Sequence, residues 1–224
     1  MLSSKGLSHL AAAVVVTSAD YGLASTWVAA SYGARGMAGL VLWLLFFRTF
    51  PLGGDMAVPN WSRIRASLSW LCSFGGVCLP VGLCALASLA LAIRAVGWNV
   101  RYELGAIGSM EEIWPFLLHG VIAAPLVEEL IHRGIVYPRL EQAMTRAQAV
   151  FVSGFLFWVL HWVDRGAVSP VNHLLAGWIL AWAAQATRSC LAPTLLHAMG
   201  NLLVLGLDIL WIQDPNLVRA VLGA

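Results

Sequence analysis

The chain has 224 residues, of which 60% are hydrophobic and only 11% are charged, and its formal net charge is +2. A soluble domain is about 45–50% apolar and about 25% charged, so a soluble fold of this length could not cover its surface with so few charges. The cations form no basic run, which argues against a nucleic-acid partner. The composition therefore predicts an integral membrane protein in contact with the lipid bilayer.

Seven apolar stretches are candidates for membrane-spanning helices, each of which needs about 20 residues. In chain order they cover about residues 8–30, 36–50, 68–93, 113–140, 147–163, 171–187 and 190–212. The first contains Asp20 and the second is short, so these two could merge into one tilted or re-entrant span. We therefore predict an all-α fold, a polytopic membrane helical bundle of about six to eight transmembrane helices, located in the cell membrane.

Polar and ionisable side chains lie inside the later apolar stretches as well as between them. They are Glu128, Glu129, His132 and Arg133 in the fourth stretch, His161 at the end of the fifth, and His197 and Asn201 in the seventh. A charge at the centre of a spanning helix costs about 2.5–3.5 kcal/mol on insertion scales. Side chains placed there are usually paired, face a water-filled cavity and serve a function.

The spacing within the fourth stretch separates two adjacent carboxylates. Glu129 and Arg133 are four residues apart, so they can form an ion pair on one helix face. Glu128 lies about 100° around the helix and shares its face with His132, which is again four residues away. We therefore expect Arg133 to form an ion pair with Glu129, so that Glu128 is the carboxylate available for catalysis.

Two prolines stand close to these side chains. Pro125 precedes Glu128 by three residues, and Pro193 precedes His197 by four. Proline removes a helical hydrogen bond and kinks the axis, and in a membrane the freed carbonyl must find a partner or face a wet cavity. Each proline could equally be an ordinary first-turn residue, a position at which proline is well tolerated.

Three short motifs, each in its own apolar stretch, follow one another along the chain: EELIHR at 128–133, FWVLH at 157–161 and HAMGN at 197–201. This series resembles the CPBP intramembrane proteases, also called the CAAX protease and bacteriocin-processing or ABI family. The resemblance covers roughly residues 113–205. It divides the chain into N-terminal membrane spans and loops at 1–112, a CPBP/ABI-like catalytic helical core at 113–212, and a C-terminal tail at 213–224. His132 departs from the pattern, because the family commonly has an apolar or aromatic residue there.

The resemblance implies a role for each motif residue. Glu128 would be the catalytic base, with Glu129, Arg133 and Phe157 in support. His161, His197 and Asn201 would complete the site. In the expected mechanism Glu128 takes a proton from a water that His161 helps to hold, and His197 and Asn201 donate hydrogen bonds to the developing oxyanion. The substrate would be a membrane-associated peptide or protein: a CAAX-type protein, a bacteriocin precursor or a C-terminal membrane anchor.

Two alternatives stay open. Two His and one Glu form a known catalytic zinc set, so Glu128, His161 and His197 are alternative metal ligands, with Glu129 as the base. We favour no metal and no cofactor, because Asn201 is a poor zinc ligand and no HExxH motif occurs. The second alternative is a non-catalytic membrane protein of immunity or proton-coupled transporter type, since buried Glu, Arg and His also build proton relays. His119 and His173 lie outside the motifs and are expected to be structural.

Overall fold

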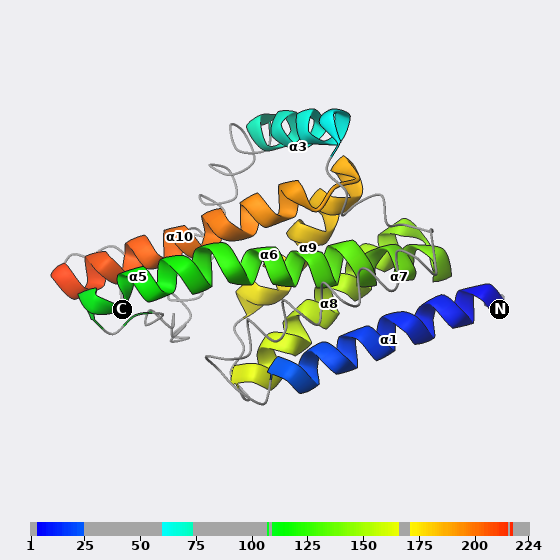
Figure 1. Cartoon of the computed structure of the whole chain (residues 1–224), viewed down its shortest axis with the longest axis horizontal. Helices are drawn as coiled ribbons and strands as arrows, with labels where there is room; N and C mark the ends of the chain where they lie inside the picture. Colours follow the sequence, from blue (N-terminus) through cyan, green and yellow to red (C-terminus); the bar gives the residue numbers. More distant parts are fainter. Residues whose placement is uncertain are drawn as a thin grey trace, which may run out of the picture.

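The computed structural model describes residues 4–24, 60–73, 107, 109–165, 171–214 and 216. All regular secondary structure within these residues is helical, which confirms the predicted all-α class for this part of the chain (Figure 1). The apolar stretch at 36–50 and most of the stretch at 68–93 lie outside the described residues.

The helices match the later apolar stretches to within a few residues. The order is α1 (Ser4–Ala24), α3 (Trp61–Ser73), a long helix made of η3 (Met110–Glu112), α5 (Ile113–Phe116), η4 (Leu117–Ala123), α6 (Ala124–Glu129), η5 (Leu130–Val136) and α7 (Tyr137–Ala143), then α8 (Arg146–Arg165), α9 (Val171–Thr187) and α10 (Leu191–Gln213). Two of the described helices, Met110–Ala143 and Leu191–Gln213, are long and apolar enough to cross a membrane. The total of six to eight spans stays a prediction.

The long helix passes twice into wider π-helical turns, η4 and η5. The amide of Ala124 closes η4 by bonding the His119 carbonyl, and the amide of Tyr137 closes η5 by bonding the carbonyl of His132, five residues earlier in each case. The next residue is a proline both times, and proline has no N–H to continue the series. The break in hydrogen bonding expected at Pro125 therefore takes the form of a π-helical turn, a feature that is frequent at functional sites.

Pro193 differs from Pro125, because it is the third residue of α10 and lies in the first helical turn. The amide of a first-turn residue has no partner within its helix, so proline costs little there. Pro193 is therefore an ordinary first-turn proline, and it does not kink α10.

The long helix runs through the middle of the arrangement, with α10 along one side and α1 along the other (Figure 1). A core of buried apolar side chains joins α1 to η5, α7, α8 and α9; it comprises Ala13, Val16, Ile131, Ile135, Val136, Tyr137, Leu140, Ala149 and Ala184. The opposite half of the long helix presents a stripe of exposed apolar side chains at every fourth position, namely Trp114, Leu118, Ile122 and Leu126. Such a stripe suits contact with lipid, in agreement with a membrane protein.

Helices α8 and α9 cross closely at a pair of glycines. A Cβ added to Gly177 would lie 2.6 Å from the carbonyl oxygen of Gly154, and a Cβ on Gly154 would lie 2.8 Å from the backbone nitrogen of Trp178. Small residues permit such close approach between helices in membranes. The crossing fixes the position of the Gly177 carbonyl relative to the rest of the bundle.

We expect Gly177→Ala to lower the midpoint of thermal unfolding by about 2–12 °C, because overpacking costs about 1–3 kcal/mol and each kcal/mol shifts the midpoint of a chain of this size by about 2–4 °C. The matched control is Gly206→Ala in α10, where an added Cβ meets nothing within 4 Å. The control should leave the midpoint unchanged or slightly higher, since alanine favours helix more than glycine does. Equal midpoints for the two variants would contradict the close crossing.

Candidate active site

Glu129 is fully buried, and one of its carboxylate oxygens accepts two hydrogen bonds. Arg133 Nη1 donates to Oε1 over 2.9 Å, and His197 Nδ1 lies 2.9 Å from the same oxygen. An ionised carboxylate only accepts hydrogen bonds, so Nδ1 of His197 carries the hydrogen. The ion pair expected between Glu129 and Arg133 is therefore present, and α10 joins it through His197.

The Arg133 guanidinium connects this ion pair to two further helices. Its Nη2 donates to the Gly177 carbonyl of α9 over 3.0 Å, and its Cζ lies 4.5 Å from the centre of the Phe157 ring of α8. Arg133 and Glu129 have no exposed side-chain surface. A buried charge pair is tolerated only where hydrogen bonds satisfy its remaining atoms, and the close crossing at Gly177 supplies one of those bonds.

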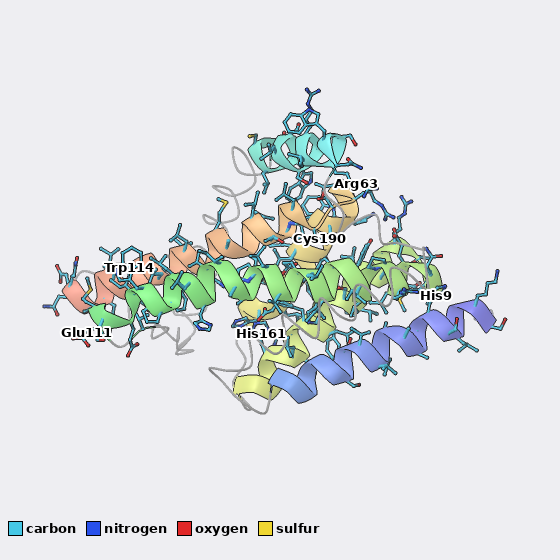
Figure 2. The ribbon with its side chains drawn as sticks, viewed as in Figure 1. His9, Arg63, Glu111, Trp114, His161 and Cys190 are labelled. Carbon is cyan, nitrogen blue, oxygen red and sulfur yellow. The ribbon has the colours of Figure 1, made fainter. Side chains whose placement is uncertain are left out.

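Glu128, the adjacent carboxylate, faces a different partner. The side chain is buried, and its Oε2 lies 3.9 Å from His161 Nε2. That separation exceeds the hydrogen-bond range of about 2.7–3.2 Å and suits a single water bound to both groups. Figure 2 shows His161 beside the middle of the long helix, far from the end that carries Glu111 and Trp114.

The hydrogen bond on the other side of the His161 ring assigns its tautomer. Nδ1 lies 2.9 Å from the backbone carbonyl oxygen of Phe157. A carbonyl only accepts, so Nδ1 is the donor, and in the neutral ring Nε2 is then a hydrogen-bond acceptor. The nitrogen that faces Glu128 thus presents a lone pair.

Phe157 is the packing centre of the site. Its buried ring contacts three imidazoles, those of His132 at 5.4 Å, His161 at 4.5 Å and His197 at 5.6 Å between ring centres. The FWVLH motif places Phe157 one helical turn from His161 and gives no sign of the other two rings. Because an aromatic ring has few rotamers and resists displacement, Phe157 holds the relative orientation of residues from three separate helices.

Asn201 lies one turn beyond His197 on α10 and reaches the long helix. Its Nδ2 donates to the Gly120 carbonyl of η4 over 2.6 Å. The amide nitrogen carries two hydrogens, and this bond uses one of them. The motif residues are therefore divided between two carboxylates and a carbonyl: His161 faces Glu128, His197 binds Glu129, and Asn201 binds Gly120.

Two further histidines belong to the surroundings of the site. His132 is fully buried and packs edge-on against Phe157. His173, on the first turn of α9, stacks on His161 with 4.5 Å between ring centres and 28° between ring planes. The sequence interpretation left His173 outside the site, because its contact depends on how α8 and α9 face each other. In the sequence, only one feature pointed to this contact: His173 stands near the start of the apolar stretch that follows His161.

The three ligands of the alternative zinc set, Glu128, His161 and His197, do not form one cluster. Among the residues that the structure describes, no three His, Cys, Asp or Glu side chains lie close enough together to hold a metal ion. His197 Nδ1 is turned to Glu129, whereas His161 faces Glu128. The two imidazoles of the zinc alternative thus serve different carboxylates.

Comparison with known proteins finds a family match for the segment that contains all three motifs. Residues 110–203 match the family model described as type II CAAX prenyl endopeptidase Rce1-like. No curated protein and no solved structure gives a significant match. The matched segment runs from η3 to the first half of α10 and includes Glu128, His161 and Asn201. Residues 110–203 are thus an Rce1-like segment, and the resemblance to the CPBP proteases is confirmed.

Proposed function

We propose that this chain is an intramembrane endopeptidase that hydrolyses a peptide bond of a membrane-associated substrate with a water activated by Glu128. The proposal rests on one observation: the adjacent carboxylates Glu128 and Glu129 have different partners. Arg133 and His197 occupy Glu129, whereas Glu128 faces the acceptor nitrogen of His161 at 3.9 Å. The Rce1-like family match supplies the reaction class, which is endopeptidase cleavage.

The arrangement suggests how the attacking water is made nucleophilic. A water between Glu128 and His161 donates one hydrogen to the carboxylate and the other to Nε2, so its lone pairs point toward the substrate. As the oxygen attacks the scissile carbonyl, Glu128 takes its proton as a general base. The protonated Glu128 then gives that proton to the leaving nitrogen, which breaks the C–N bond. The direct products are a carboxylic acid and an amine, which exchange a proton to become a carboxylate and an ammonium ion, and no covalent enzyme intermediate forms.

The oxyanion formed in this step needs hydrogen-bond donors. We assign the second N–H of Asn201 to it, because the first is bound to Gly120. His197 contributes from Nε2 when both ring nitrogens are protonated. In that charge state Arg133 and His197 together balance the charges of the two carboxylates, Glu128 and Glu129. Each such donor is worth about 3–4 kcal/mol of transition-state stabilisation.

The substrate class follows from the family and from the surroundings of the site. The matched model is named for CAAX prenyl endopeptidases, so a CAAX-type membrane-anchored protein is the first candidate. A bacteriocin precursor and a C-terminal anchor segment are the others. All three reach the protein from the bilayer, where the apolar stripe on the long helix already faces outward.

Liposomes that contain the purified protein test this proposal against a transporter or a non-catalytic immunity protein. Three membrane-anchored reporter peptides, one for each candidate class, are offered on both sides of the membrane, and mass spectrometry identifies the products. We expect at least one peptide to be cut at a single internal bond, by wild type and not by His161→Ala. If all three stay intact while the liposomes show proton or solute flux, the chain is a transporter and the protease assignment fails.

We also propose that the hydrolysis needs no metal ion. Glu129 was the base in the zinc alternative, yet its Oε1 accepts bonds from both Arg133 and His197. A base engaged in this way cannot approach a water at Glu128 without breaking a buried ion pair. The side chains around Glu128 account for water activation by themselves.

A further inference from the structure

One backbone carbonyl of the long helix lacks its usual donor because of a proline. Bonds in η4 span five residues, and the last runs from the Ala124 amide to the His119 carbonyl. In that register the next bond would run from residue 125 to the carbonyl of Gly120. Residue 125 is proline and has no hydrogen to donate. The sequence of the long helix thus leaves the Gly120 carbonyl open to a donor from outside the helix.

That donor comes from the active site. Asn201 Nδ2 donates to the Gly120 backbone oxygen over 2.6 Å, a short bond between a side chain and a carbonyl 81 residues apart in sequence. An amide fixed by one N–H holds its second N–H in a defined direction, because the group is planar. Asn201 is on the same face of α10 as His197, one turn away, and His197 binds Glu129 beside Glu128.

We infer that Pro125 is a positioning residue: by withholding a backbone N–H from Gly120, it keeps open the carbonyl that orients the Asn201 amide toward the reaction centre. The proline touches neither substrate nor water in this account. It acts through a single hydrogen bond, and the inference rests on the proposed function only for the consequence in catalysis.

The second π-helical segment offers a matched control within the same helix. Its last bond runs from the Tyr137 amide to the His132 carbonyl, and Pro138 follows in the same register. Here the carbonyl left without a backbone donor belongs to Arg133 and is not a partner of Asn201. Pro138→Ala therefore makes the same chemical change in the backbone without supplying a donor to Gly120.

The first test measures thermal unfolding of the full-length protein in detergent for Asn201→Ala in three backgrounds. In wild type we expect the midpoint to fall by about 2–8 °C, because a partly buried carbonyl loses its partner. In Pro125→Ala the new N–H at residue 125 serves the same carbonyl, so the fall should be less than half as large. In Pro138→Ala the full fall should remain. An equal fall in all three backgrounds would overturn the inference.

A second variant keeps the inference testable if Pro125→Ala does not fold. Asn201→Asp preserves the shape of the side chain but places a carboxylate oxygen, which only accepts, against the Gly120 oxygen. The midpoint should fall at least as far as for Asn201→Ala. A wild-type midpoint for Asn201→Asp would show that the bond to Gly120 does not matter, and would overturn the inference.

The third readout is catalytic and separates positioning from simple stability. Pro125→Ala should lower kcat several-fold with KM nearly unchanged, and it should have no further effect once Asn201 is alanine. Additive losses in the double variant would overturn the role in catalysis. The coupling in thermal midpoints does not depend on activity, so it can hold even if the chain proves not to be a protease.

Discussion

Glu128→Gln is expected to lower the turnover of a cleaved reporter by about 10²–10⁴-fold, the range that a general base contributes. Glutamine has nearly the same size and still accepts hydrogen bonds, but it cannot take the proton from the attacking water. The midpoint of thermal unfolding should stay within a few degrees of wild type, because Glu128 lies outside the Arg133 ion pair. Initial rates in liposomes and melting curves in detergent measure the two quantities.

Glu129→Gln is the matched control, since it makes the same chemical change at the neighbouring position. This variant should lose stability, because Arg133 and His197 would face a neutral amide in a fully buried place. The opposite pattern, in which Glu128→Gln keeps its activity and Glu129→Gln loses activity at an unchanged melting temperature, would reverse the assignment of the two carboxylates.

Arg133→Met should destabilise the protein more than any other substitution considered for this chain. Removing one partner of a buried ion pair costs about 3–5 kcal/mol, which corresponds to roughly 6–20 °C in the unfolding midpoint for a chain of this length. Glu129 would keep its contact with His197 but lose the guanidinium, and the Gly177 carbonyl would lose the Arg133 donor. Methionine is chosen because it fills a similar volume.

Two further variants show whether the loss of stability in Arg133→Met comes from breaking the buried charge pair. Arg65→Met removes a cation from the exposed face of α3 and should change stability by less than about 0.5 kcal/mol. The double variant Arg133→Met/Glu129→Gln removes both buried charges, so it should recover a large part of the stability lost in Arg133→Met. A double variant as unstable as the single one would argue against an uncompensated charge.

The features predicted from sequence are those that depend on one helix at a time. Glu129 and Arg133 share a face because they are four residues apart, and their ion pair is present although the helix passes into π-helical turns between them. The boundaries of the long helix, α8, α9 and α10 follow from apolar stretches for the same reason. The three motifs predicted the family of the segment at 110–203.

The contacts that could not be predicted depend on how separate helices are rotated against one another. His161 and His197 were expected to complete one site around Glu128, yet they face different carboxylates, Glu128 and Glu129 respectively. The stacking of His173 on His161 arises from the hairpin of α8 and α9. Sequence spacing fixes directions around one helix axis only, so it carries no information on these pairs.

Pro125 in the long helix was only partly predictable, because the sequence indicates a broken hydrogen bond but not the backbone geometry that results. Pro125 indicated a broken hydrogen bond, but not that the break would be preceded by π-helical turns. Nor did the sequence indicate that the freed carbonyl of Gly120 would bind Asn201 from α10. A proline in the sequence predicts that a nearby backbone carbonyl lacks its donor. Which side chain then binds that carbonyl depends on how another helix packs against it.

We propose above all that side chains of this chain, led by Glu128, activate the attacking water without a metal ion. The most direct test measures the turnover of the purified wild-type protein in lipid nanodiscs after exhaustive chelation, with the residual metal content determined on the same sample. We expect the turnover to be unchanged when metal is far below the protein concentration. Turnover that falls in step with the metal content and returns on addition of zinc would contradict the claim.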